Sequence, residues 1–168
     1  MAPNGNIGLF ERYRDAWRRI NSAIKLGFYF EAIAIEESIL SNRIISFLYG
    51  VRKLRAAEIR GRSPRFVCLI KLWREACEES SGYWQNPGDL IDRVNAWRAK
   101  RNDAVHALTR AFPGEAPPIS LEEFLKQAEI AANEGAKLAR EVGNWHRRQL
   151  RKARALELVP PRSPECVG

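Results

Sequence analysis

Apolar residues recur every three or four positions along most of this chain, and that spacing is the feature that most limits its fold. Such spacing places side chains on one face of a helix, whereas a half-buried strand needs strict alternation. No segment shows a convincing strand pattern, and glycines and prolines divide the periodic stretches into helix-sized lengths. The sequence therefore predicts an all-α fold, an up-and-down bundle of four main helices plus an appended C-terminal helix.

The breaks in the pattern set the expected bounds of these helices. We expect helices over residues 7–26, 28–56, 66–79, 89–110 and 121–154. Gly27 should end the first helix, and Ser120 should cap the last one, with Glu123 completing a capping box. A length of 168 residues predicts a single helical domain over residues 1–156, followed by a flexible, proline-containing tail over 157–168.

Two of the predicted apolar helix faces each contain one charged residue. Glu37 lies on the apolar face of the second helix, and Arg101 lies on that of the fourth, in line with Trp97 and Val105. A lone charge costs several kcal/mol to bury, so each should find a partner. We therefore predict that Glu37 and Arg101 pair across two packed helices. The alternative is a small rotation of either helix, which would leave the charges at the edge of the face in water.

The composition and the missing motifs argue against several classes of function. Three cysteines without a Cys-x-x-Cys spacing, and only two histidines, argue against a disulfide framework and against a metal site. The chain has no phosphate-binding glycine loop and no nucleophile motif, and we expect no cofactor. It also lacks an apolar run of about 18 residues and an N-terminal signal-peptide core, so we expect a soluble cytoplasmic protein that is not bound to a membrane.

The charge balance points to a negatively charged partner. The net charge is +8, and most of the 28 basic residues are arginines, which bind phosphate with two prongs and stack on bases. The alternative explanation of the many arginines is a GC-rich genome, which enriches arginine in all proteins. The last predicted helix carries the basic residues that we expect to bind RNA: Lys137, Arg140, Arg147, Arg148 and Arg151.

The fourth predicted helix carries the residues for a reaction. RNA cleavage by its own 2′-hydroxyl needs proton transfer near neutral pH, which a histidine such as His106 can perform. It also needs positive charge on the phosphate, which Arg101 can supply. Positions five apart differ by about 140° on a helix, so these two could converge only through the length of arginine or in a dimer. Asn102 shares the face of His106 and could hold the imidazole or touch phosphate.

The segment Arg101-Asn102-Asp103-Ala104-Val105-His106 resembles the Arg-x4–6-His motif of HEPN domains, with a polar residue directly after the arginine. The resemblance implies a bundle of four or five helices and a metal-independent endoribonuclease of toxin–antitoxin or phage-defence systems. It also implies a homodimer that brings two motifs into one cleft, and an antitoxin or regulatory protein as a further partner. Arg101 and His106 would be the catalytic pair, Asn102 a supporting residue, and Glu37, or as second choice Glu36, the acidic residue.

Other interpretations remain open from the sequence. The looser form of the motif also matches Arg140 and His146, for which we favour a basic helix face that contacts phosphate or solvent. His106 could be a structural histidine. The same bundle could then be a non-catalytic module that binds RNA or nucleotides, or a helical adaptor whose basic helix docks on an acidic partner.

Overall fold

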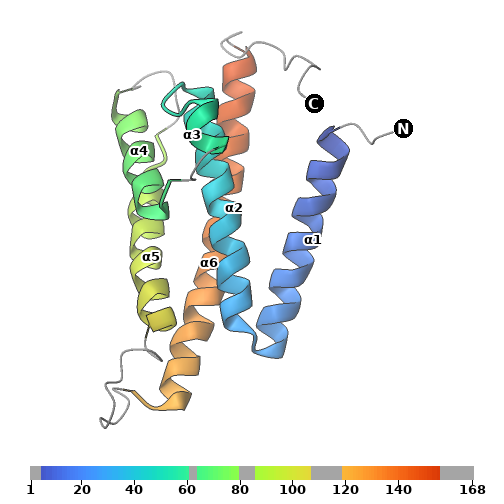
Figure 1. Ribbon diagram of the computed structural model, residues 1–168, viewed down its shortest axis with the longest axis vertical. Coiled ribbons are helices and arrows are strands. Elements are labelled where there is room, and N and C mark those ends of the chain that lie inside the picture. The colour runs from blue at the N-terminus through green and yellow to red at the C-terminus, as the bar shows by residue number, and fades with distance from the viewer. Residues whose placement is uncertain (1–4, 61–63, 80–85, 107–118, 156–168) are drawn as a thin grey trace.

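The computed structural model describes residues 5–60, 64–79, 86–106 and 119–155 (Figure 1). These residues form six helices and no strand, which confirms the predicted all-α bundle. The helices are α1 (Gly5–Leu26), α2 (Tyr29–Gly50), α3 (Ala56–Arg60), α4 (Phe66–Glu79), α5 (Leu90–His106) and α6 (Leu121–Ala155). In the part of the chain so described, no helix has the length and apolar character needed to cross a membrane.

Helices α2 and α6 pack along each other and form the centre of the bundle. Helices α4 and α5 cover one side of this pair, and α1 covers the other side (Figure 1). The last helix, expected as an appendage, is thus a central element that contacts α1, α2 and α5. With 35 residues, α6 is longer than every other described helix, and its C-terminal end extends beyond the ends of the other helices (Figure 1).

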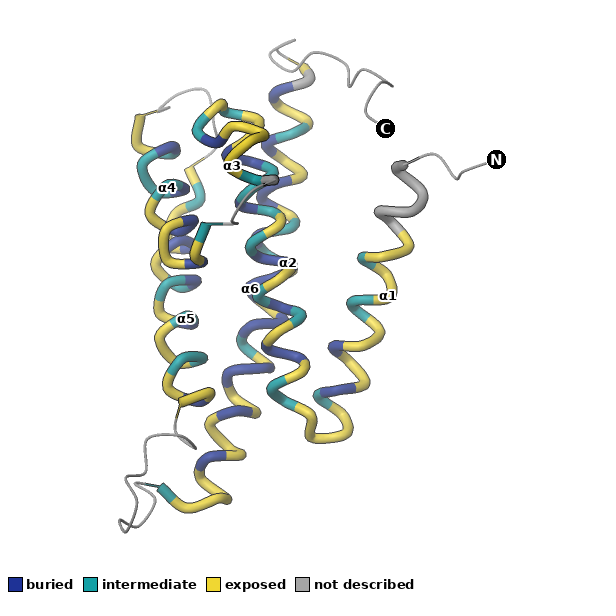
Figure 2. Tube along the Cα trace, viewed as in Figure 1, coloured by how far each residue is buried: buried dark blue, intermediate teal, exposed yellow. Residues whose placement is uncertain are grey.

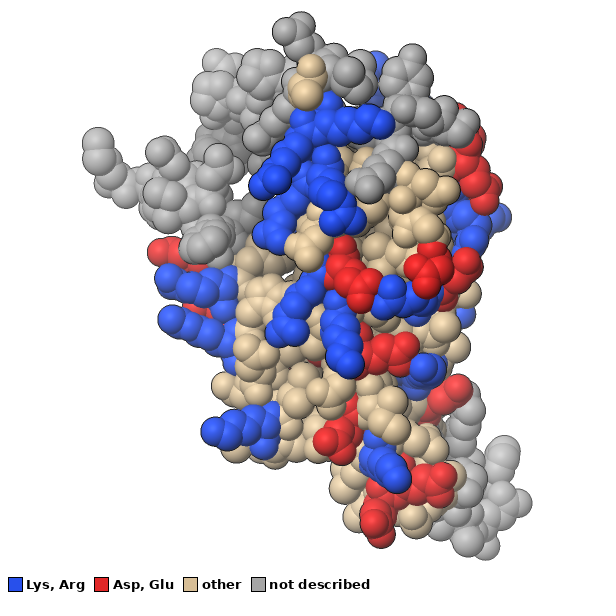
Figure 3. Space-filling view, turned by 180° about the vertical axis from the view of Figure 1, so that it is seen from behind, with Lys and Arg blue, Asp and Glu red and all other residues tan. Residues whose placement is uncertain are grey.

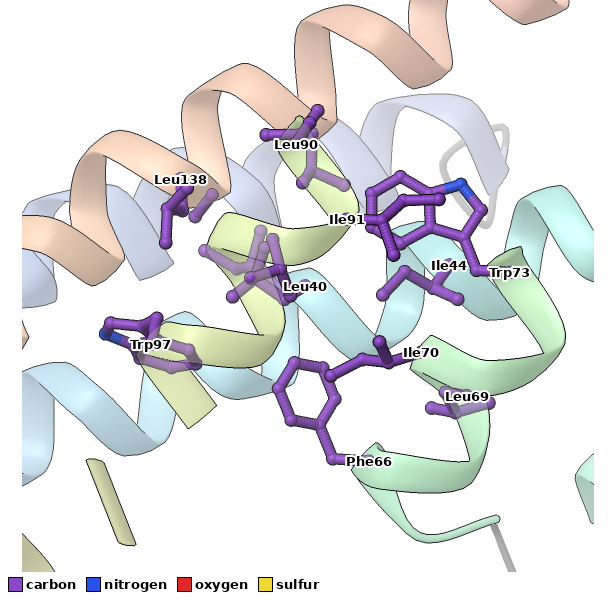
Figure 4. Packing of buried hydrophobic residues seen from close by; sticks show 14 of the residues in the cluster. Leu40, Ile44, Phe66, Leu69, Ile70, Trp73, Leu90, Ile91, Trp97 and Leu138 are labelled. Carbon is purple, nitrogen blue, oxygen red and sulfur yellow. The ribbon is translucent and has the colours of Figure 1, made fainter. Parts of the chain in front are cut away.

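Three tryptophans from three helices form much of the core. Trp73 of α4, Trp97 of α5 and Trp145 of α6 are all almost fully buried. The ring centroids of Trp73 and Trp145 lie 5.1 Å apart, and Phe47 of α2 lies 4.7 Å from Trp145. Figure 4 shows Trp73 and Trp97 among the aliphatic residues of the cluster, and Figure 2 shows that buried positions face the inside of the bundle. Aromatic packing therefore links α2, α4 and α6.

The small residues of α6 allow neighbouring helices to come close. A Cβ atom added to Gly135 would overlap with Glu36 Oε2 of α2 and lie 2.8 Å from Trp97 Cζ2 of α5. The indole Nε1–H of Trp97 donates a hydrogen bond of 2.8 Å to the carbonyl oxygen of Ala131 on α6. A glycine is therefore needed at position 135 because three helices meet there.

Two predicted helix ends are confirmed and one is wrong. Gly27 has a φ of +78° and follows α1, and the Ser120 hydroxyl accepts a 3.1 Å hydrogen bond from Glu123 N–H at the start of α6. The second helix ends at Gly50 instead of continuing to residue 56. Arg52 takes a φ of +61°, and Lys53 N–H bonds to the Leu48 carbonyl at 2.9 Å. This is the hydrogen-bonding pattern of a Schellman motif, which closes a helix.

The apolar face of α5 also differs from the predicted one. Val105 is 40% exposed, whereas Ala104 is buried, because the buried positions of α5 are 90, 91, 94, 97 and 104. On α6, Leu121 and Leu125 are exposed, whereas Phe124 is buried and stacks on Phe30 of α2 with 5.3 Å between ring centroids. The expected continuation of α5 to residue 110 and the tail over 157–168 lie outside the described residues.

Candidate functional site

The predicted ion pair between α2 and α5 is confirmed. The guanidinium group of Arg101 contacts the carboxylate of Glu37, and their side chains are 19% and 27% exposed. The apolar spacing of each helix turns these residues toward the neighbouring helix, while their exposed fractions place them at its edge. Each charge thereby offsets the desolvation of the other.

An open pocket of about 320 Å³ lies beside this ion pair. It brings together three of the four predicted catalytic residues, Glu37, Arg101 and Asn102. The other lining residues are Arg98 of α5, Phe66 and Val67 at the start of α4, and Arg65 directly before α4. Three guanidinium groups and one carboxylate leave this pocket with an excess of positive charge, which favours an anion such as phosphate.

Two of these arginines were not among the predicted site residues. Arg98 precedes Arg101 by three positions on the same helix, so the helical period places both side chains on neighbouring faces. That spacing in the sequence could have identified Arg98 as a site residue. Arg65 directly precedes α4, and only the packing of α4 against α2 and α5 brings it to the pocket. No spacing along the chain could have indicated that contact.

His106 does not line this pocket. It is the last described residue of α5 and is exposed, five positions beyond Arg101. Five residues advance about 7.5 Å along a helix and turn by about 140°, as expected from the sequence. Within one chain, the structure therefore gathers Glu37, Arg101 and Asn102 and leaves His106 on a different side of α5.

The fully buried acid of α2 is Glu36 rather than Glu37. Its side chain is 0% exposed and lies against Gly135 and Trp97. Its carboxylate oxygens have no hydrogen-bond partner among the described residues. Burial raises the pKa of Glu36 from 4.5 to about 8, and the positive charge of Arg140 partly opposes that rise. Glu36 therefore belongs to the helix packing, and it does not line the pocket that contains Glu37.

The five residues expected to bind RNA lie together on α6. Lys137, Arg140, Arg147, Arg148 and Arg151 are all exposed, and the helical period places them within about 100° of its circumference. Figure 3 shows Lys and Arg side chains gathered along this face of the molecule. The guanidinium of Arg140 also lies over the Trp17 ring of α1, 4.8 Å from its centroid. We call these five residues the α6 basic face.

His146 does not belong to that face, and its assignment there was wrong. It is only 2% exposed because it lies on the side of α6 that faces the core. The six-residue offset from Arg140 places it about 120° away around the helix, outside the basic face. The second match to the loose motif therefore joins a surface arginine to a core histidine.

No group of histidine, cysteine and acidic side chains among the described residues could hold a metal ion. Comparison of the chain with protein-family models, with curated proteins and with solved structures finds no match. The arguments about function therefore rest on the pocket at Arg101 and on the α6 basic face.

Proposed function

We propose that this protein is a metal-independent endoribonuclease of the HEPN type that acts in the cytoplasm. The observation that carries the proposal is the pocket in which Arg65, Arg98 and Arg101 converge beside Asn102. All but Arg65 belong to α5, the helix that ends at His106 in the described residues. A phosphodiester is the anion that an open, arginine-lined pocket of this size fits best.

The proposed chemistry uses the 2′-hydroxyl of the RNA as the nucleophile. That oxygen attacks the adjacent phosphorus atom, and the bond from phosphorus to the 5′-oxygen breaks. The arginines stabilise the extra negative charge on the phosphate oxygens in the transition state. A histidine takes the proton from the 2′-hydroxyl or gives one to the leaving 5′-oxygen, for which His106 is the candidate. Asn102 would orient the phosphate or the imidazole.

The position of His106 outside the pocket favours a homodimer in this proposal. A second copy can supply its own histidine, so that His106 of the partner subunit approaches Arg101. Two exposed apolar side chains suit such a contact, since Val67 lines the pocket and Val105 adjoins His106. An antitoxin or other regulatory protein would then act by covering the same surface, as expected for a toxin or a phage-defence protein.

The α6 basic face would add affinity for the RNA backbone. Its side chains are exposed and concentrated on one side of a rigid helix. Contacts between cations and phosphates release counterions, so this part of the binding should weaken as salt rises.

Cleavage of labelled RNA in EDTA tests the proposal. The wild type should cleave, and His106→Ala should lose cleavage by about 100-fold or more while it retains RNA binding. Gln127→Ala, an exposed neutral change on α6, is the matched control and should cleave like the wild type. Equal cleavage by His106→Ala and wild type would contradict the assignment of the histidine.

A second candidate is a bundle that binds RNA without cleaving it. It is favoured by the engagement of Arg101 with Glu37 and by the absence of His106 from the pocket lining. If this second hypothesis is right, the wild type should not cleave RNA under any condition. The affinity for RNA should then fall by at least tenfold when Arg147, Arg148 and Arg151 are replaced by glutamine.

A further inference from the structure

A second pocket, of about 260 Å³, lies between α1 and α6. Its polar lining consists of Asn21 and Lys25 from α1, and Asn133, Lys137 and Arg140 from α6. Figure 1 shows α1 on the opposite side of the α2–α6 pair from α4 and α5. This α1–α6 pocket is therefore separate from the candidate site at Arg101 and carries no residue of the proposed reaction.

The α1–α6 pocket collects positive charge without a carboxylate in its lining. Lys25, Lys137 and Arg140 all face it, and its remaining residues are neutral. Within the described part of the chain, none of the three forms an ion pair, in contrast to Arg101 of the other pocket. Three converging cations repel one another, and a bound anion would relieve that repulsion.

The acid that interacts with Arg140 does not supply the missing charge. Glu36 interacts electrostatically with Arg140, but its pKa of about 8 leaves it mostly protonated at pH 7. It is also buried against Gly135 and Trp97, on the inner side of α6. The positive charge of Arg140 is thus available to a ligand on the outer side, next to its contact with the Trp17 ring.

The two asparagines add neutral donors to the charged ones. Asn133 Nδ2 donates a hydrogen bond of 2.9 Å to the Glu129 carbonyl, which uses one of its two amide hydrogens. Asn21 presents its amide from the facing helix. Several donors that converge from two helices suit the oxygen atoms of a phosphate group, which can accept bonds from many directions.

We propose that the α1–α6 pocket is a second anion site that binds a phosphate group. Lys137 and Arg140 belong both to this pocket and to the α6 basic face, so the two surfaces are continuous. The phosphate can therefore come from the backbone of an RNA strand that follows α6, or from a small free phosphate compound. Asn21, Lys25 and Asn133, which lie outside the α6 basic face, are the residues that this inference adds.

Titration of the isotope-labelled full-length protein with inorganic phosphate, followed by NMR, tests the site. The side-chain amide signals of Asn21 and Asn133 should shift with saturation, because each amide reports on the pocket directly. Lys25→Gln removes one exposed cation from the rim and should weaken this phosphate binding by about tenfold. Lys126→Gln is the control, because Lys126 is also exposed but lies about three turns of α6 before Lys137. This variant should leave the affinity for phosphate unchanged.

A second titration with a short single-stranded RNA distinguishes the two sources. If Lys25→Gln weakens binding of RNA as well as of phosphate, the pocket holds a backbone phosphate. If it weakens only the binding of phosphate, the site serves a small phosphate compound. Equal phosphate affinity in Lys25→Gln and Lys126→Gln, or the absence of shifts at Asn21 and Asn133, would overturn the proposal. Neither readout depends on RNA cleavage, so the proposed ribonuclease activity can fail without affecting this result.

Discussion

The protonation state of Glu36 couples the stability of the fold to pH. The folded protein keeps a proton on this carboxyl group up to a pH of about 8, whereas an ordinary glutamate loses it near 4.5. Between these values the folded state binds more protons than the unfolded state, so stability falls as pH rises through the interval. The loss is complete once the pH exceeds the folded value, because a charged carboxylate is then buried against Gly135 and Trp97.

Replacement of Glu36 by glutamine should remove most of this pH dependence. Glu36→Gln keeps the shape of the protonated acid, so its free energy of unfolding should equal that of the wild type near pH 5. At pH 8.5 the variant should be more stable by about 4 kcal/mol. Urea unfolding at several pH values measures both. Glu31→Gln, an exposed change on the same helix, should keep the wild-type slope, and an equal slope in Glu36→Gln would contradict the buried acid.

The ion pair of Glu37 and Arg101 predicts a non-additive mutant cycle. Glu37→Leu leaves the half-buried Arg101 without its carboxylate and should cost about 1–2 kcal/mol of unfolding free energy. Addition of Arg101→Leu should recover most of that loss, because no uncompensated charge remains. Urea unfolding of the wild type, both single variants and the double variant measures the coupling. Additive effects of the two substitutions would mean that the pair contributes nothing to the fold.

At the scale of the helix, two glycines of α6 predict opposite effects of the same substitution. Gly135→Ala should destabilise the protein by about 1–3 kcal/mol, because its methyl group overlaps with Glu36 and Trp97. Gly143→Ala meets nothing within 4 Å and should stabilise it by about 0.5–1 kcal/mol through helix propensity. Thermal unfolding of both variants tests the close packing of α6. A gain in stability from Gly135→Ala would show that α2 and α5 lie farther from α6.

Most helix boundaries could be predicted from the sequence because local chemistry sets them. Gly27 and Ser120 end and begin helices by hydrogen bonds within a few residues, and both act as expected. The end of α2 escaped prediction because the left-handed residue there is Arg52, a type that seldom takes that conformation. The full burial of Glu36 also lay beyond the sequence, since α2 packs against α1, α4 and α6 and is apolar on most sides.

For the whole molecule, the ion pair could be predicted but not the pocket around it. Two opposite charges in two apolar helix faces had to meet, so Glu37 and Arg101 were identified together. Arg65 reaches the same pocket only through the packing of α4, a contact between residues 28 or more positions apart along the chain. The α1–α6 pocket has the same origin, because it joins Lys25 to Arg140 across the bundle. Contacts of this range depend on the assembled fold and leave no local pattern.

The proposed dimer makes a prediction that only the assembled molecule can satisfy. If each site joins Arg101 of one chain to His106 of the partner subunit, the variants Arg101→Gln and His106→Ala should each be inactive alone. Mixed in equal amounts and allowed to exchange subunits, they should recover about a quarter of the wild-type RNA cleavage. Half of the dimers are then mixed, and each mixed dimer holds one intact site of two. A mixture of His106→Ala with the double variant Arg101→Gln/His106→Ala is the control and should stay inactive, since no intact site can form. No recovery in the first mixture, or a monomer by light scattering at micromolar concentration, would contradict the shared site.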